Sequence, residues 1–161
     1  MKTKLYASGK KTLHVLNDLI RINIDLIAGF EKAAHEEKTP EPELRDAFYR
    51  LAVESRSYVN ALHAQVIRLG GAPVTQATIT GKIYLHWLEG KNRFDGADSQ
   101  LRLAACRASA EATETAYRQA LDEHLSHDLH QLLENQLWAL ERAHQQLHDL
   151  ESSITQHDQH H

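Results

Sequence analysis

Four long stretches of helical periodicity constrain the fold of this 161-residue chain more than any other feature. In each stretch apolar residues recur every three or four positions, which is typical of a helix with one buried face. No stretch shows the strict alternation of a strand. The expected helices span about residues 12–37, 43–69, 98–124 and 128–154. The sequence therefore predicts an all-α protein with a single helical domain over residues 12–154.

The helix boundaries follow from residues that start or stop helices. Thr12 is a suitable N-cap for the first helix. Pro40 and Pro42 separate the first two helices, because proline clashes with a helix interior. Residues 70–73, Gly-Gly-Ala-Pro, end the second helix, and a joint of three residues, 125–127, links the last two.

The connection between the second and third helices, residues 72–96, is much longer than the other two. About 25 extended residues reach further than the roughly 40 Å of a 27-residue helix, so this connection can run the full length of a bundle. The expected fold is then two antiparallel helical hairpins joined by a long crossover, the topology of ferritin-like four-helix bundles. A weakly helical piece, residues 82–89, predicts a short helix within the crossover, with Trp87 as a packing anchor.

The two ends of the chain lie outside this pattern. We expect residues 1–11, which carry the only cluster of lysines, to form a flexible basic arm. We expect residues 155–161, which are rich in histidine, to form a disordered tail that could bind metal loosely.

Composition excludes several classes of function. The net charge of −4 argues against a nucleic-acid-binding surface, and no apolar run is long enough to span a membrane. No signal peptide is evident at the start of the chain. The single cysteine, Cys106, excludes an internal disulfide and fits a reducing cytoplasm, and its helical spacing predicts a small buried side chain.

The third expected helix is apolar on two faces, which predicts burial on both. One face is made of small residues (Leu101, Ala104, Ala105, Ala108, Ala112), and the opposite face carries larger ones (Leu103, Cys106, Ala110, Tyr117, Leu121). We expect the second face to meet the crossover or a second copy of the protein, and we expect a homodimer.

His144 is the most informative candidate for chemistry. It shares a narrow arc of the fourth helix with Leu140 and Leu147, so the imidazole should face the core, three residues after Glu141. Inward Glu-x-x-His pairs hold metal ions in ferritin-like bundles. With the crossover topology, Glu54 and Glu111 come to the same height as His144.

The sequence thus predicts a tentative metal site made of Glu54, Glu111, Glu141 and His144, suited to iron, manganese or zinc. Ile24 takes the inward position of the first helix at this height, and the three glutamates lie at the edges of their stripes. The alternative interpretation is that no metal binds and that His144 forms a hydrogen bond with a neighbouring polar group such as Ser55, Glu54 or Glu111.

Two further groups of polar residues have competing interpretations. Glu31, His148 and Glu151 come to one height near the end of the first helix, which predicts a buried polar cluster with a Glu31–His148 contact, or a second small metal site. Three histidines near the joint of the last two helices recur every three residues and are either solvent-facing or a surface chelate (His124, His127, His130). Trp138 is expected to anchor the packing of the fourth helix.

The order of several short pieces resembles a known family. These pieces are residues 12–20, Asn23, Asp25, residues 29–34, Arg56, residues 68–73, Gly81-Lys82, Trp87, residues 117–121 and His144. They resemble a small bacterial ferritin-like four-helix-bundle family that is known only as a domain of unknown function. The resemblance covers roughly residues 12–150 and implies a ferritin-like bundle of the bacterial cytoplasm, with no established reaction.

The sequence departs from the ligand pattern of metal-containing members of the wider superfamily. The second helix should carry its own Glu-x-x-His pair, yet Glu54 is followed at that spacing by Ser57. We therefore expect a non-enzymatic cytoplasmic protein without a cofactor, acting as a homo-oligomer or binding a protein partner, with a possible role in stress. The alternative is an iron- or manganese-binding protein that handles oxygen or peroxide.

Overall fold

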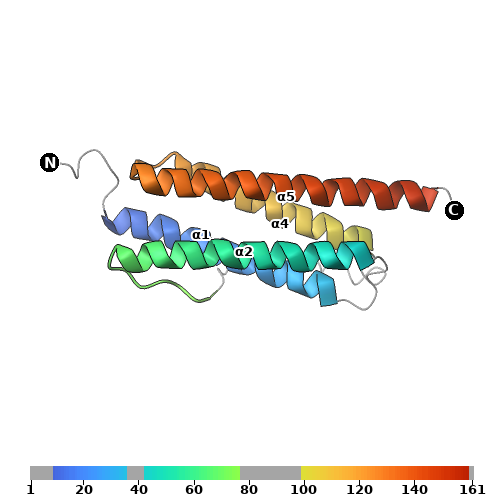
Figure 1. Cartoon of the computed structure of the whole chain (residues 1–161), viewed down its shortest axis with the longest axis horizontal. Coiled ribbons are helices and arrows are strands. Elements are labelled where there is room, and N and C mark those ends of the chain that lie inside the picture. Colours follow the sequence, from blue (N-terminus) through green and yellow to red (C-terminus); the bar gives the residue numbers. More distant parts are fainter. Residues whose placement is uncertain (1–8, 36–41, 77–98, 160–161) are drawn as a thin grey trace.

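The computed structural model describes residues 9–35, 42–76 and 99–159, and within these ranges every regular element is an α-helix. The elements are α1 (Gly9–His35), α2 (Pro42–Arg68), α4 (Ser99–Leu121) and α5 (His127–Gln159). They lie lengthwise beside one another in one bundle (Figure 1). The expected all-α four-helix bundle is confirmed for the part of the chain that is described.

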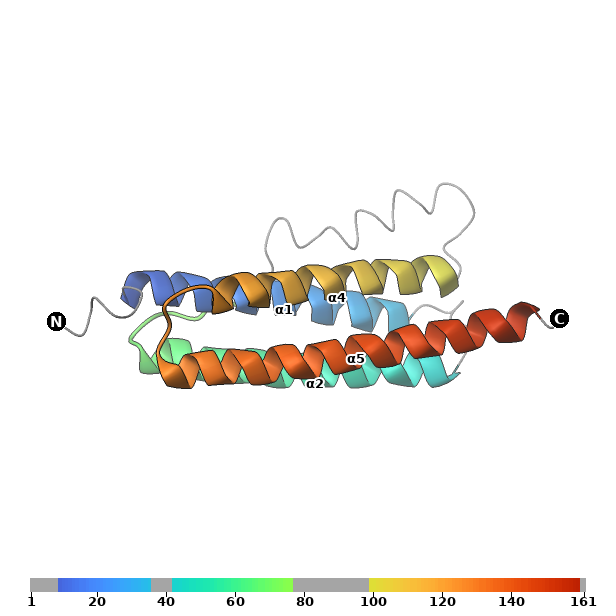
Figure 2. The same cartoon turned by 90° about the horizontal axis from the view of Figure 1, so that it is seen from above.

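The four helices occupy the corners of a square. α1 packs against α2 and α4, and α5 packs against α4 and α2, whereas the backbones of the diagonal pairs stay further apart. Seen from above, α1 and α4 form one side of the bundle and α2 and α5 form the other (Figure 2). Both hairpins, α1–α2 and α4–α5, are antiparallel (Figure 1).

α2 and α4 run in the same direction, so the end of α2 and the start of α4 lie at opposite ends of the bundle (Figure 1). This is the one-crossover order of helices that the length of residues 72–96 predicts. Residues 72–76 of that connection are described. The remainder of the connection, with the expected short helix and Trp87, lies outside the described residues.

The chain is held where it leaves α2. Gly70 has a φ of 82°, and the N–H groups of Gly70 and Gly71 donate to the carbonyls of Ile67 and Val66. This pair of bonds is the Schellman motif, which satisfies carbonyls at a helix end. The side chain of Asn17 on α1 then accepts a hydrogen bond from the N–H of Val74 at 3.0 Å. The first residues after α2 therefore lie along the start of α1.

The apolar faces of all four helices meet in one core. Its fully buried large side chains are Leu16, Leu19, Ile20 and Leu26 on α1, Leu44, Phe48 and Leu62 on α2, Tyr117 on α4 and Leu133 on α5. Cys106 is 1% exposed, as its spacing predicts. The described helices include none that is both long and apolar enough to cross a bilayer.

Two expectations about the chain ends are wrong. α1 begins at Gly9, so Thr12 is a buried residue inside the helix rather than its N-cap, and residues 9–11 do not belong to a flexible arm. α5 continues to Gln159 instead of ending near residue 154. Neither extension contains proline, and adding a residue to an existing helix gains one hydrogen bond for each residue fixed. Residues 1–8, 160 and 161 lie outside the described part.

The two-faced interpretation of the third helix also needs correction. The face with Cys106, Ala110 and Tyr117 is turned to the core of this bundle, whereas Ala108 and Ala112 on the small face are exposed. On the small face Ala105 is still buried at 2% exposure, so only the part of that face at Ala108 and Ala112 is left to the solvent.

Trp138 was expected to anchor the packing of the fourth helix, but 60% of its surface is exposed. It lies five residues after Leu133, a turn of roughly 140° from that core position at 100° per residue, which directs it away from the core. The guanidinium of Arg142 lies 4.7 Å from the centre of its ring, a cation–π contact one helical turn along.

Candidate functional site between α4 and α5

The site is centred on His144 of α5, whose side chain is 16% exposed. Its Nδ1 lies 3.3 Å from both carboxylate oxygens of Glu114 on α4. Its Nε2 lies 4.0 Å from a carboxylate oxygen of Glu111, one turn earlier on α4. The antiparallel packing of α4 and α5 thus places one imidazole between two carboxylates.

Glu114 and Glu111 differ sharply in their surroundings. Glu114 is only 7% exposed, whereas the side chain of Glu111 is 64% exposed. A buried carboxylate needs a partner, because an unpaired charge in the interior is costly. Glu114 is therefore the structural partner of His144, and its acceptor oxygens favour the imidazole form that carries a proton on Nδ1. Nε2 then faces the exposed side of the site.

A groove of about 660 Å³ opens on that exposed side. Its α4 wall carries Ala104, Arg107, Ala108, Glu111 and Glu114, and its α5 wall carries Glu141, His144, Gln145 and His148. The alanines leave room between the helices, and the lining is otherwise polar. The groove can therefore admit ions and small polar molecules to the Nε2 side of His144.

On its other side His144 borders a slot between α2 and α5. Glu54, Ser55 and Tyr58 of α2 lie along this slot, and Leu26 and Phe30 of α1 are among its apolar lining. Its free volume is about 10 Å³. That is at or below the roughly 10–15 Å³ that one water molecule needs. His144 thus lies between an open polar groove and a tightly packed slot.

The four predicted metal ligands do not converge. Glu111, Glu141 and His144 line the groove, but Glu54 is exposed and borders the slot instead. Glu141 forms a 3.4 Å ion pair with Arg118. Among the described residues, no set of three His, Cys, Asp or Glu side chains is arranged to hold a metal ion. The site implied by metal-containing ferritin-like bundles does not fit these side chains as they stand.

The sequence interpretation missed Glu114, the closest partner of His144. A signal was present, since Glu114 lies four residues after Ala110 and three before Tyr117, both on the core-facing side of α4. The interpretation named Ser55, Glu54 and Glu111 as partners, and only Glu111 lies at ion-pair distance, at 4.0 Å.

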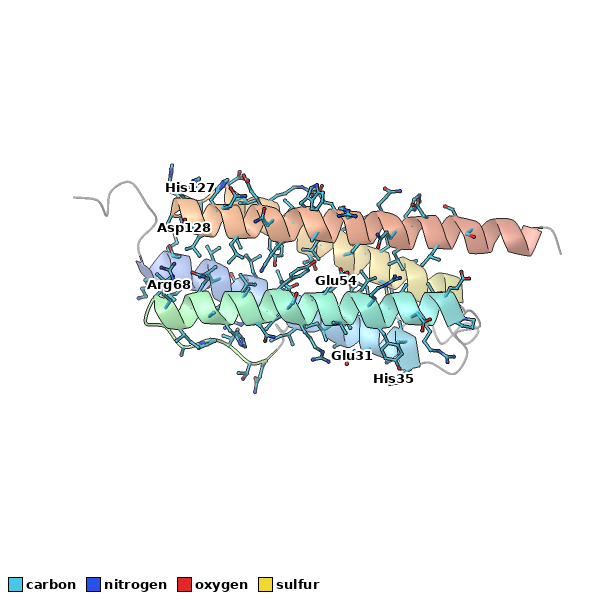
Figure 3. The ribbon with its side chains drawn as sticks, in the orientation of Figure 1. Glu31, His35, Glu54, Arg68, His127 and Asp128 are labelled. Carbon is cyan, nitrogen blue, oxygen red and sulfur yellow. The ribbon has the colours of Figure 1, made fainter. Side chains whose placement is uncertain are left out.

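The predicted cluster of Glu31, His148 and Glu151 is also not formed as expected. Glu31 is partly exposed and pairs with Arg56 of α2, and His148 is exposed in the groove. Glu31 is on α1 and meets the face of α2 that packs against α1, whereas Glu54 lies on the face of α2 that is turned toward α5 (Figure 3). α1 and α5 occupy diagonal corners of the bundle, and Glu31 pairs with Arg56 rather than with His148. The side chain of Glu151 lies outside the described residues.

A second polar group is enclosed in the core, and its α5 member, Gln136, lies about two helical turns before His144. Asn23 donates to Tyr117 Oη at 2.9 Å, and the Tyr117 hydroxyl donates to Gln136 Oε1. At the height of this group, the inward-facing residue of α1 is Asn23, which is 0% exposed. Ile24, the residue that was predicted to face inward, is only partly buried. Burial raises the pKa of Tyr117 well above its usual value, despite the opposing effect of the hydrogen bond from Asn23.

The surface histidines near the joint of α4 and α5 are solvent-facing. His124 and His127 are exposed, and His130 is partly exposed and pairs with Glu134 at 3.1 Å. No metal-holding set is found there in the described part of the chain. The joint itself ends with Ser126, whose side chain accepts a bond from the N–H of Leu129 and caps α5.

Comparisons with known proteins agree with this fold. Residues 11–123 match the model of a family described as a domain of unknown function, DUF2383. A comparison with curated proteins gave no match. Among solved structures, the chain is similar to the bacterioferritin-related protein from Bacteroides fragilis, described as a dodecameric thioferritin. The two share 18% sequence identity with a TM-score of 0.76, over 98% of this chain and 96% of that one. This likeness shows the ferritin-like fold.

Proposed function

The chain belongs to the DUF2383 family of unknown function, and from this premise we propose that it acts as a homo-oligomeric ferritin-like bundle without a catalytic role. In this proposal the protein works through assembly, and its outer helix faces form the contacts between copies. The number of subunits is left to measurement, with a homodimer as the smallest assembly.

One observation supports the proposal more than any other: an outward apolar row on α2. Val53 and Ile67 are 65% and 63% exposed, and Tyr49 on the same side is 38% exposed. At 100° per residue the three side chains fall within about 40° of one another. Tyr49 and Val53 lie one turn apart, and exposed Arg56 and Asn60 stand between Val53 and Ile67 on the same face, so the contact that we propose is a mixed apolar and polar one.

The likeness to the Bacteroides fragilis protein adds support, because that protein is described as dodecameric and the likeness extends over nearly the whole of both chains. A chain with this fold can therefore be part of a homo-oligomer. A closed assembly of identical chains would cover the α2 row on every subunit.

The mass of the purified protein in solution tests this function. Light scattering coupled to size exclusion should give a multiple of the 18.3 kDa chain. Val53→Glu places a charge in the proposed contact and should shift the mass toward the monomer. Gln146→Glu, an exposed change on α5, should leave the mass unchanged. A wild-type monomer at all accessible concentrations would overturn the proposal.

The alternative is an iron or manganese protein that handles oxygen or peroxide. The fold and the thioferritin description of the similar protein favour it. The divergence of Glu54 and the pairing of Glu141 with Arg118 speak against it, because they leave His144 with few convergent carboxylates. Elemental analysis of untagged protein purified without added metal decides between them, since about one iron or manganese per chain, lost in His144→Ala, would favour the alternative.

A cytoplasmic location is part of the same proposal. It rests on the single buried cysteine, which fits a reducing compartment. Fractionation of cells that make the protein at its natural level, followed by detection with an antibody, tests this location.

A further inference from the structure

The outward face of α2 carries a projecting apolar side chain and, next to it, a shallow hole. Val53 projects, with 65% of its surface exposed. The hole begins one turn further along, and its four members have short side chains (Ser57, Asn60, Ala61, Ala64). Their spacing of i, i+3, i+4 and i+7 is that of the four residues that receive one side chain from a facing helix in knobs-into-holes packing. α2 therefore presents both halves of one packing contact.

These two halves fit each other when two copies of α2 lie antiparallel about a two-fold axis near Ser57. Val53 and Ala61 each lie four residues from Ser57, on opposite sides of it along the helix. In this arrangement Val53 of one protomer faces the hole around Ala61 of the partner subunit. The two-fold axis repeats the contact, because both protomers use the same surface.

The other exposed apolar residues of the α2 row also find partners in this arrangement. Tyr49 and Ile67 are 18 residues apart, which is five full helical turns, so they lie on the same flank of α2. Like flanks of two antiparallel helices meet across a two-fold axis. Tyr49 lies eight residues before Ser57 and Ile67 lies ten residues after it. Tyr49 of one protomer and Ile67 of the partner subunit thus come to similar heights, about 3 Å apart along the axis.

Charged residues at both ends of this face are complementary. Asp46 and Arg68 are exposed and each lies eleven residues from Ser57, so each faces the other across the two helices. Exposed Arg50 and Glu54 follow Asp46 at one-turn intervals, so each end of the contact holds two carboxylates and two guanidinium groups. A parallel pair of α2 helices would instead place every charge against its own copy, which is unfavourable.

We propose that a second copy of this chain docks on the outward face of α2, with the two α2 helices antiparallel and a two-fold axis close to Ser57. The partner is a second copy because the projecting side chain, the hole and the opposite charges all belong to one helix and complement one another. This contact rests on the proposed homo-oligomeric function and specifies the surface and orientation through which two protomers meet.

A cysteine placed at the axis tests the contact on the full chain. A disulfide needs Cα atoms within about 7 Å, so only a residue near a two-fold axis can pair with its own copy. Oxidation of Ser57→Cys with diamide should give a covalent dimer on a non-reducing gel. Ala64→Cys is the matched control, because it is exposed on the same face but its two copies would lie about 20 Å apart. Cys106 is present in both variants and is 1% exposed.

Ser57→Cys should form its dimer at least about tenfold faster than Ala64→Cys, because the docked contact raises the effective thiol concentration above that of random collision. An oligomeric wild type in which the two variants cross-link at equal rates overturns this contact and leaves the proposed homo-oligomer standing. A wild type that is monomeric at all accessible concentrations overturns both. Circular dichroism confirms that each variant is folded.

Reversal of the end charges gives a second measurement. Asp46→Arg and Arg68→Asp should each raise the dissociation constant of the dimer about three- to tenfold, since each change places like charges together at both ends. The double variant exchanges the two charges and should bind nearly as tightly as wild type. Two independent surface changes would add their effects instead, so a double variant that is weaker than either single one contradicts the facing of Asp46 and Arg68.

Discussion

Nδ1 of His144 lies 3.3 Å from both carboxylate oxygens of Glu114, and this contact joins α5 to α4 where the groove meets the core. Both side chains are largely removed from water. Each therefore depends on the other for a polar partner, which makes the contact structural whether or not the groove binds an ion.

Replacing Glu114 should destabilise the bundle. Glu114→Ala leaves His144 Nδ1 without its buried acceptor, and an unsatisfied buried polar group costs about 1–3 kcal/mol of unfolding free energy. Urea unfolding followed by circular dichroism measures the loss. The matched change Glu111→Ala removes an exposed carboxylate and should cost less than about 1 kcal/mol. Equal losses in the two variants would contradict a structural role for the Glu114 contact.

Tyr117→Phe should also lower the unfolding free energy. The change removes the donor to Gln136 Oε1, whereas Asn23 Nδ2 keeps its bond to the carbonyl of Leu19. The Gln136 acceptor and one N–H of Asn23 are then left unsatisfied, which we expect to cost about 1–3 kcal/mol. Tyr49→Phe is the control, because its hydroxyl bonds His35 Nδ1 at 3.2 Å on the exposed surface, and it should change stability by no more than about 0.5 kcal/mol.

Periodicity was sufficient to predict the four helices, the inward position of His144 and the burial of Cys106, because these depend on apolar spacing within one segment. The partner of His144 could not be predicted in this way. It depends on how far α4 is rotated against α5, and that rotation is set by packing over the whole core. Spacing from Ala110 and Tyr117 marks Glu114 as core-facing, but only the placement of α5 shows that His144 is its partner.

Alkaline pH should destabilise the protein through its buried tyrosines. Burial raises the pKa of Tyr117 well above the usual value near 10, and burial followed by repulsion from Glu54 raises that of Tyr58 to about 12. The unfolded chain then loses these protons at lower pH than the folded chain. Stability from this source is therefore fully present below about pH 10 and falls as pH rises through the window from 10 to 12.

The expected slope for Tyr117 is about 1.4 kcal/mol per pH unit within that window. Tyr58 is partly exposed, so solvent screening reduces its contribution. Urea midpoints measured between pH 8 and pH 11.5 give the profile, and Tyr117→Phe should show a shallower fall than wild type. A profile that is equally steep in both would mean that Tyr117 does not carry the effect.

Replacing either of the two glycines after α2 with alanine should change the stability of the protein differently from replacing the glycine at the start of α1. Gly70 has a φ of 82°, so Gly70→Ala forces a side chain into the left-handed region and should cost about 1–2 kcal/mol. A Cβ at Gly71 would meet Leu13 Cδ2 at 2.5 Å, and the cost depends on how far that flexible side chain can move. Gly9 has nothing within 4 Å and begins a helix, so Gly9→Ala should leave the melting temperature unchanged or raise it. Thermal unfolding of the three variants checks this order, and a Gly70→Ala protein as stable as wild type would contradict the left-handed helix end.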